Sequence, residues 1–343
     1  MSTEKKSEQL PRNPNLELAF AASQIKGTRR YQEDSFRIFT DKISGTASIE
    51  HLFVLCDGMG GHRDGNVAST LVCKVFTEAF AESQCSVQER LMLSLEQANR
   101  KLADEIQGLS EGTDMGTTLV AAWVMDNCVS WISVGDSPLW LIRDNRIKRL
   151  NEDHSMSPVF QKMVELGQMS AEEAASDPKR HVLRSAVRGD QIRIVDQSTQ
   201  PFALHPQDQL LLATDGLETL SEQTILQVIQ DNRAKACDKV LSTLFNCVNG
   251  LALPEQDNAS AIFIRLPESN TSSQPQKQSN LRVRIVLWMF YILGAMTFSA
   301  LATWYYWDQR SIDATEFNKN EPHTTSLHAT SPSTSDEQHG DNQ

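Results

Sequence analysis

Short alternating or continuous runs of apolar residues recur between Leu16 and Leu266, which predicts a series of strands. Two turn signals, Asp126-Asn127 and Asp144-Asn145, separate three of these runs. The predicted strands are Leu16–Ala22, Phe36–Thr40, His51–Cys56, Thr117–Val124, Cys128–Val134, Leu139–Arg143, Arg193–Gln197, Gln209–Ala213 and Ala259–Arg265.

Apolar residues spaced by three and four positions predict helices between these strands. The predicted helices are Asp64–Ser83, a helix carrying Val87 to Ile106 on one face, Pro158–Leu166, Ser170–Ala175, Glu222–Ile229 and Lys235–Val248. Groups of strands followed by pairs of helices fit two sheets covered by helices, whereas a parallel sheet would need strands and helices to alternate. The sequence therefore predicts an α+β fold, a four-layer αββα sandwich of two mostly antiparallel sheets.

The rest of the chain has a different composition. Residues 1–15 are polar and predicted to be disordered, and 16–266 form the predicted globular domain. Residues 267–284 are a Ser/Gln-rich linker with a basic end, and 308–343 are a Ser/Thr-rich tail that we expect to be disordered. Between them, Ile285–Trp307 has no charged residue and at ~1.5 Å per residue could cross a bilayer core of ~30 Å. We expect one C-terminal transmembrane helix; a buried core helix is the alternative.

The charges on either side of this span predict its orientation. Lys277, Arg282 and Arg284 precede it, whereas the tail has two basic and seven acidic residues. By the positive-inside rule, residues 1–284 are cytoplasmic and the tail lies on the opposite side of the cell (inner) membrane. All six cysteines lie before the span.

Composition excludes some functions. The net charge of the 343 residues is −12, which argues against nucleic-acid binding because the phosphate backbone would repel the chain. The six cysteines form no CxxC pair, which argues against a zinc site, and most lie in apolar stretches, as expected of reduced core thiols.

Acidic residues gather where predicted strands begin or end. Asp57 follows one strand and precedes a glycine-rich turn, Asp215 follows another, and Asp257 precedes the last. Each of them alone could be an ordinary turn or cap residue. Together with Glu33 and Asp34, converging carboxylates without a counter-charge would repel one another, and hard cations such as Mg²⁺ and Mn²⁺ prefer oxygen ligands. We therefore predict a two-metal centre able to act on a phosphate.

A phosphate would also need a positive side chain. Arg29 and Arg30 lie just before Glu33, and a guanidinium group matches the geometry of a phosphate. One of the two arginines is expected to be an ordinary surface residue.

Seven short motifs follow one another along the chain. They are Arg29-x-x-x-Glu33-Asp34, Asp57-Gly58-x-Gly60-Gly61-His62-x-x-Gly65, Gly116-Thr117-Thr118, Gly135-Asp136-Ser137, Asp153-His154-Ser155, Thr214-Asp215-Gly216 and Asp257-Asn258. Their order resembles that of the bacterial PPM family of metal-dependent protein serine/threonine phosphatases (type 2C phosphatases), over about Leu16 to Leu266.

The resemblance implies a role for each site residue. Asp57 would bridge two Mn²⁺ or Mg²⁺ ions, with the Gly58 carbonyl on the first, while Asp215 and Asp257 complete the second. Glu33 and Asp34 would act through metal-bound water, and Arg29 would bind the substrate phosphate. Asp136 with Asp215 would match a third-metal site. The segment Pro158–Arg188 corresponds to the family's flap near the active site.

Two departures from the family pattern bear on these roles. Pro138 stands where arginine is usual, beside the third-metal motif. Met59 stands where many eukaryotic members have a histidine proposed as the general acid.

The expected function is hydrolysis of phosphoserine and phosphothreonine by direct attack of hydroxide held by two metals, on a Ser/Thr kinase and its substrates at the membrane. One alternative is a membrane-anchored pseudophosphatase that binds phosphoproteins or assembles a complex without turnover. Another is a phosphatase that acts on a regulatory antagonist protein.

Overall fold

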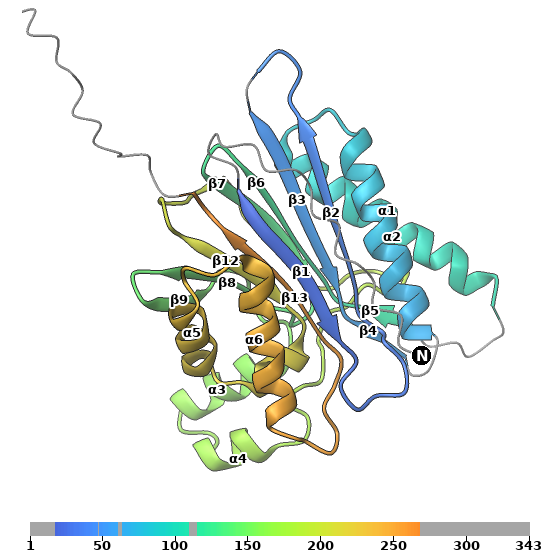
Figure 1. The fold of residues 1–343 in the computed structure, drawn as a ribbon. Coiled ribbons are helices and arrows are strands. Elements are labelled where there is room, and N and C mark those ends of the chain that lie inside the picture. Colours follow the sequence, from blue (N-terminus) through green and yellow to red (C-terminus); the bar gives the residue numbers. More distant parts are fainter. Residues whose placement is uncertain (1–17, 47, 61–63, 110–114, 268–343) are drawn as a thin grey trace, which may run out of the picture. The chain divides into compact units, whose positions relative to one another are not determined.

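A computed structural model describes residues 18–46, 48–60, 64–109 and 115–267 (Figure 1). The predicted N-terminal extension (1–15), the linker apart from residue 267, the membrane span and the tail lie outside these residues, as do Gly61 and His62. Within the described ranges, every helix is too short or too polar to cross a membrane.

Two antiparallel sheets form the centre of the fold. The first sheet has the strand order β1 (Ala19–Ile25), β13 (Ala259–Arg265), β12 (Gln209–Ala213), β8 (Leu139–Arg143) and β9 (Arg146–Arg149). The second has the order β10 (Asp196–Gln197), β7 (Cys128–Val134), β6 (Leu119–Met125), β3 (Ile49–Cys56) and β2 (Ser35–Lys42), with β11 (Phe202–Ala203) also on β7. A short pair, β4 (Gly58–Met59) and β5 (Gly116–Thr117), follows β3 and precedes β6.

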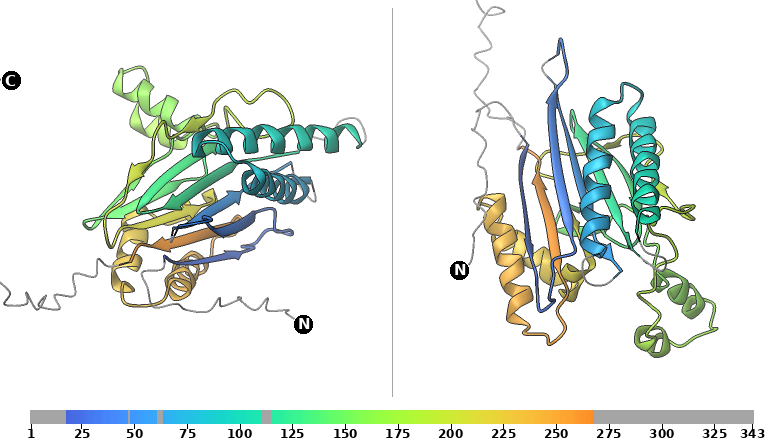
Figure 2. Two further views of the ribbon diagram at one scale, coloured as in Figure 1. Left: turned by 90° about the horizontal axis from the view of Figure 1, so that it is seen from above. Right: turned by 90° about the vertical axis from the view of Figure 1, so that its right-hand side faces the viewer.

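Helices cover the outer face of each sheet (Figures 1 and 2). The helices α1 (Asp64–Glu82) and α2 (Val87–Gln107) pack on the second sheet, and α5 (Glu222–Asp231) and α6 (Cys237–Gly250) pack on the first. The order of layers in the described region is therefore helices, sheet, sheet, helices. Two shorter helices, α3 (Ser157–Glu165) and α4 (Ala171–Ser176), lie apart from these layers, and a 3₁₀ turn, η1 (Asp215–Thr219), follows β12.

The central strands are apolar on both faces because both faces are covered. In β3, Leu52, Val54 and Cys56 pack under α1 and α2. Phe53 and Leu55, which alternate with them, face the other sheet. This two-sided burial explains the continuous apolar run in the sequence.

A buried ion pair connects the second sheet to its helices. Arg90 of α2 donates from Nη1 and Nη2 to the carboxylate of Glu50, at 2.8 and 3.0 Å, and the Trp123 indole donates to the same carboxylate at 2.7 Å. The guanidinium group also lies 3.8 Å from the centre of the Phe80 ring. Burial alone would raise the pKa of Glu50, but these hydrogen bonds lower it below its usual value.

The predicted elements differ from the observed ones mainly at ends and edges. The first strand begins at Ala19 instead of Leu16, and the predicted strand Thr117–Val124 is interrupted at Thr118. Only the last two residues of the predicted strand Arg193–Gln197 pair with β7. The patterns did not predict the short pieces β4, β9, β11 and η1, because a few residues without a regular apolar face carry too little signal.

Candidate active site

The predicted acidic residues come together because they lie at the ends of paired strands. Asp57 follows β3, and Asp34 precedes β2, whose first residue Ser35 pairs with Cys56 at the end of β3. In the other sheet, Asp215 follows β12 and Asp257 precedes β13, and these two strands pair with each other. The structure therefore places four carboxylates at one end of the two sheets.

Asp34 is held by two hydroxyl groups from the other sheet. Its Oδ2 accepts hydrogen bonds from Ser260 Oγ at 2.7 Å and Thr214 Oγ1 at 3.0 Å, and its exposed fraction is only 3%. The pKa of Asp34 is raised to about 7, mainly by burial and in smaller part by the charges of Asp215 and Asp257, while the two hydroxyl groups act against the rise. A buried carboxylate with no cation beside it is costly to ionise.

Asp57 is fixed through its backbone. Its N–H donates to Thr118 Oγ1 at 3.0 Å, and its carbonyl accepts from Thr118 N at 2.9 Å and from Thr117 Oγ1 at 2.7 Å. The side chain forms a hydrogen bond with Asp215. Burial, followed by the charges of Asp215, Asp34, Asp136 and Asp257, raises the pKa of Asp57 well above its usual range. The five acidic groups thus share one electrostatic environment.

Asn258 connects the first and last segments of the site. Its Oδ1 accepts from Glu33 N at 2.7 Å, and its Nδ2 donates to the carbonyls of Lys26 and Tyr31 at 2.7 and 3.0 Å. Ser69 of α1 donates to the Glu33 carbonyl at 2.5 Å. Asn258 therefore fixes the loop that carries Arg29, Glu33 and Asp34, across more than 220 residues of sequence.

The glycine after Asp57 is required by close backbone contact. A Cβ atom on Gly58 would lie 2.2 Å from the Gly65 carbonyl oxygen and 2.4 Å from that of Glu33. Any larger residue would push the Asp57 turn away from α1 and from the Glu33 loop. This explains the glycine-rich sequence after β3.

Two cationic side chains act on Asp215. Arg29 Nη2 forms an ion pair with Asp257 Oδ2 at 2.6 Å, and both side chains are substantially exposed. Burial is the main cause of the raised pKa of Asp215, and the charges of His181 and Arg29 oppose it. His181, on the predicted flap, was not among the predicted site residues.

Asp136 is buried on the side of the site nearest β9. Its pKa is raised to about 8, mainly by burial and in smaller part by the charge of Asp215, while the charge of Arg149 opposes the rise. Arg149 Nη2 donates to the Asp136 carbonyl at 2.5 Å, and its Nη1 lies 3.7 Å from Asp153 and 3.8 Å from Glu218. Arg149 thus supplies positive charge to the turn that carries Asp136. In this turn Pro138 takes the place of the arginine that is usual in the family pattern.

The donor set fits hard divalent cations. These buried and half-buried groups are carboxylates, their pKa values are raised, and the neighbouring cations oppose only part of this repulsion. In the described residues, however, no three Asp, Glu, His or Cys side chains are already gathered closely enough to hold a metal ion. Asp57, Asp215 and Asp257 are the side chains that could hold cations here, with Glu33, Asp34 and Asp136 in the same group.

Sequence reasoning missed the neutral residues that hold the carboxylates. Ser260 and Thr214 bind Asp34, Thr118 binds Asp57, and Asn258 binds the Glu33 loop. All of them lie in or beside the quoted motifs, but a single hydroxyl or amide group at a strand end gives no periodic signal. Arg149 lies in the missed strand β9.

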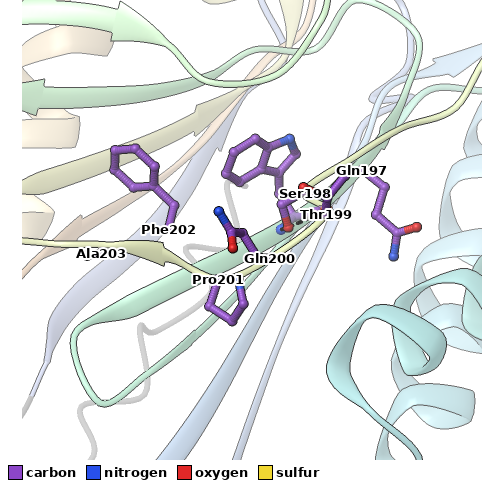
Figure 3. Close-up of a pocket in the computed structure, with 8 residues that line it drawn as sticks. Gln197, Ser198, Thr199, Gln200, Pro201, Phe202 and Ala203 are labelled. Atoms are coloured by element: carbon purple, nitrogen blue, oxygen red, sulfur yellow. Dashed lines mark hydrogen bonds between the residues drawn. The ribbon is translucent and has the colours of Figure 1, made fainter.

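A separate pocket of about 540 Å³ lies along β7, on the loop between β10 and β11 (Figure 3). It is lined by Trp131, Gln197, Ser198, Thr199, Gln200, Pro201, Phe202 and Ala203. This lining contains neither the carboxylates nor any other titratable side chain, so we assign it no catalytic role.

Two antiparallel sheets lie between helix pairs, with carboxylates at the shared end of the sheets. This α+β arrangement is the fold of the PPM protein phosphatases. The family model for protein phosphatase 2C matches residues 27–255. The chain belongs to this family.

Several bacterial phosphatases are similar to this chain. The serine/threonine phosphatase stp of Listeria welshimeri is 28% identical over 243 residues, which cover 69% of this chain and 90% of the relative. The solved structure of the Mycobacterium tuberculosis serine/threonine phosphatase PstP/Ppp is similar with a TM-score of 0.60 and 26% identity, over 73% of this chain and 99% of that one. Another structure, of the PstP catalytic domain with two manganese ions, has a TM-score of 0.58 and 26% identity, over 73% of this chain and 99% of that one.

Proposed function

We propose that this chain is a metal-dependent protein serine/threonine phosphatase. The observation that carries the proposal is the group of buried and half-buried, mutually repelling carboxylates at the shared end of two sheets, in a chain of the protein phosphatase 2C family. Two divalent cations, Mn²⁺ or Mg²⁺, would supply an activated water and positive charge for the phosphoryl oxygens when bound there. The stp and PstP relatives are named serine/threonine phosphatases, which supports phosphoserine and phosphothreonine as substrates.

The acidic side chains would have different roles around the phosphoryl group. Asp57 would bridge the two cations and Asp215 and Asp257 would complete the second, while Thr117 and Thr118 keep the Asp57 backbone in place. Asp34 and Glu33 would orient water around the cations. Asp136, with Asp215, would serve a third cation.

Arg29 would bind the substrate phosphate. It already contacts Asp257 through one terminal nitrogen at 2.6 Å, and a guanidinium group has five N–H donors. Arg29 can therefore keep Asp257 and still direct donors to a phosphate at the exposed mouth of the site.

The membrane location is part of the proposal. The uncharged span 285–307, the basic residues before it and the acidic tail after it support one membrane-spanning helix with the catalytic domain in the cytoplasm. A tether would raise the local concentration of membrane-bound phosphoproteins, such as a Ser/Thr kinase and its substrates. The test is a C-terminal fusion to a reporter that functions only in the cytoplasm. Activity of that reporter would contradict this orientation.

The test is hydrolysis of a phosphothreonine peptide by the full chain in detergent, with Mn²⁺, with Mg²⁺ and with EDTA. We expect turnover only with a metal, loss of most turnover in Asp57→Asn, and normal turnover in Asp41→Asn, an exposed control at the end of β2. Absence of turnover with either metal, in a chain that still binds Mn²⁺, would favour the alternative of an anchored phosphoprotein-binding protein.

A further inference from the structure

The predicted flap, Pro158–Arg188, is tied to the rest of the domain mainly near its ends. It contains α4, which buries none of its residues, and nearly all of α3, where only Phe160 is buried. Segments with so little buried surface open easily unless hydrogen bonds at their ends hold them. The residues just before the flap are therefore important for its position.

His154 lies just before the flap and contacts the turn that carries Asp136. It is fully buried, and its Nδ1 accepts a hydrogen bond from Gly135 N at 3.1 Å. The backbone N–H of His154 donates to the Gly135 carbonyl at 3.1 Å. A single residue thus binds both backbone groups of Gly135, next to Asp136.

Gly135 itself leaves little freedom in this turn. Its φ is +107°, a conformation that favours glycine, and a Cβ atom there would lie 2.6 Å from Thr118 Cγ2. Thr118 in turn holds Asp57 and donates to or accepts from Ser137 Oγ at 2.7 Å. The turn bound by His154 is therefore packed against the residue that fixes Asp57.

The other side of His154 binds the returning end of the flap. Its carbonyl accepts from Arg184 N at 2.8 Å, and Arg184 Nε donates to the Ser155 carbonyl at 2.9 Å. Met156 N donates to the Val182 carbonyl at 3.0 Å, and Ser155 forms a β-bridge with Leu183. One short stretch, His154 to Met156, is thus bonded to the flap and to the Asp136 turn.

We propose that His154 is a positioning residue that couples the flap to the Gly135–Asp136 turn, so that the flap and the Asp136 carboxylate are ordered together. The proposal rests on the proposed function only in taking Asp136 as part of the phosphatase site. Because Nδ1 accepts a hydrogen bond from a backbone N–H, the ring carries its hydrogen on Nε2. Burial favours this neutral form, since it lowers the pKa of His154.

The acceptor atom gives a matched pair of variants. In His154→Asn, Oδ1 takes the place of Nδ1 and can still accept from Gly135 N, whereas His154→Leu keeps an apolar side chain of moderate size without an acceptor. The measurement is amide hydrogen exchange of the full chain in detergent, with and without Mn²⁺, followed at Gly135–Asp136 and across the flap. Lys162→Met, on the exposed face of α3, is the control.

We expect His154→Leu to speed exchange roughly tenfold at both places, because a buried N–H loses its partner, and to lower kcat by a similar factor. His154→Asn and the control should stay close to the wild type. Equal effects of Asn and Leu, or no faster exchange in the Leu variant, would overturn the proposal.

A second variant perturbs the opposite end of the connection and does not depend on the folding of His154→Leu. Arg184→Met removes the side-chain bonds to the Ser155 and Asp153 carbonyls without touching Gly135. Coupling predicts faster exchange at Gly135 and Asp136 as well as in the flap; faster exchange in the flap alone would refute it. Because exchange is read without substrate, a chain that failed to hydrolyse phosphopeptides would still test the coupling separately from the proposed function.

Discussion

Replacing Asp34 with asparagine should stabilise the cation-free protein at high pH. The Asp34 carboxyl has a pKa of about 7 in the fold against 3.8 ordinarily, so the unfolded chain ionises it at lower pH than the folded chain does. Between these two values, rising pH therefore favours unfolding. Asparagine has no charge to bury, and its Oδ1 can still accept from Ser260 and Thr214.

The size of the effect follows from the shift. The pKa of Asp34 is about 7 in the fold against 3.8 ordinarily, and each tenfold change in acidity is worth ~1.4 kcal/mol. The asparagine variant should therefore gain roughly 4 kcal/mol in the free energy of unfolding at pH 8, and less than ~2 kcal/mol at pH 5. For a domain of this size, the gain at pH 8 is a rise in Tm on the order of 10 °C. It should fade towards pH 4 and vanish below that pH, where the unfolded chain also binds the proton.

The assay is thermal unfolding of the full chain in detergent and EDTA between pH 4 and pH 8, with Asp41→Asn as the exposed control. Saturating Mn²⁺ should narrow the gap at pH 8, because a bound cation stabilises the charged wild-type site but not the neutral one to the same degree. A gain that is equal at pH 5 and pH 8, or a loss at pH 8, would refute the electrostatic reasoning.

Three further predictions test other parts of the structure. Arg29→Ala should raise the KM for a phosphopeptide more than it lowers kcat in steady-state kinetics, whereas Arg30→Ala, whose guanidinium lies over the Tyr31 ring, should not. Arg90→Met should lower the free energy of unfolding by about 3–5 kcal/mol in urea titrations, because Glu50 would keep a buried charge without its partner. Removal of residues 285–343 should leave a soluble, active domain in size-exclusion and activity assays; aggregation would place the boundary elsewhere.

Apolar periodicity predicted most of the long elements of this fold. β3 and β13 were found because both faces are covered and their apolar runs are continuous. Their pairing partners were not predicted, since β1 and β13 meet across the whole length of the domain and no local pattern carries that information. The short strand β9 was missed for lack of length, and with it Arg149.

The acidic residues of the candidate site were predicted because several carboxylates stand at strand ends in one chain, although each of them alone could be a turn or cap residue. Their roles as metal ligands remain predictions. What the sequence could not provide was the support of these groups: Ser260 contacts Asp34 from 226 residues away, and Asn258 reaches Lys26 from 232 residues away. Such contacts depend on how two sheets are stacked, which local spacing does not determine.

The connection through Asn258 also has a consequence for the order of folding. A chain is synthesised from its N-terminus, and contacts between distant residues form late because they close long loops. β13 lies between β1 and β12, and Asn258 stands immediately before it. A nascent chain that has not reached Asn258 therefore lacks both an inner strand and the amide that fixes the Arg29–Asp34 loop, so the site can be completed only at the end of domain synthesis.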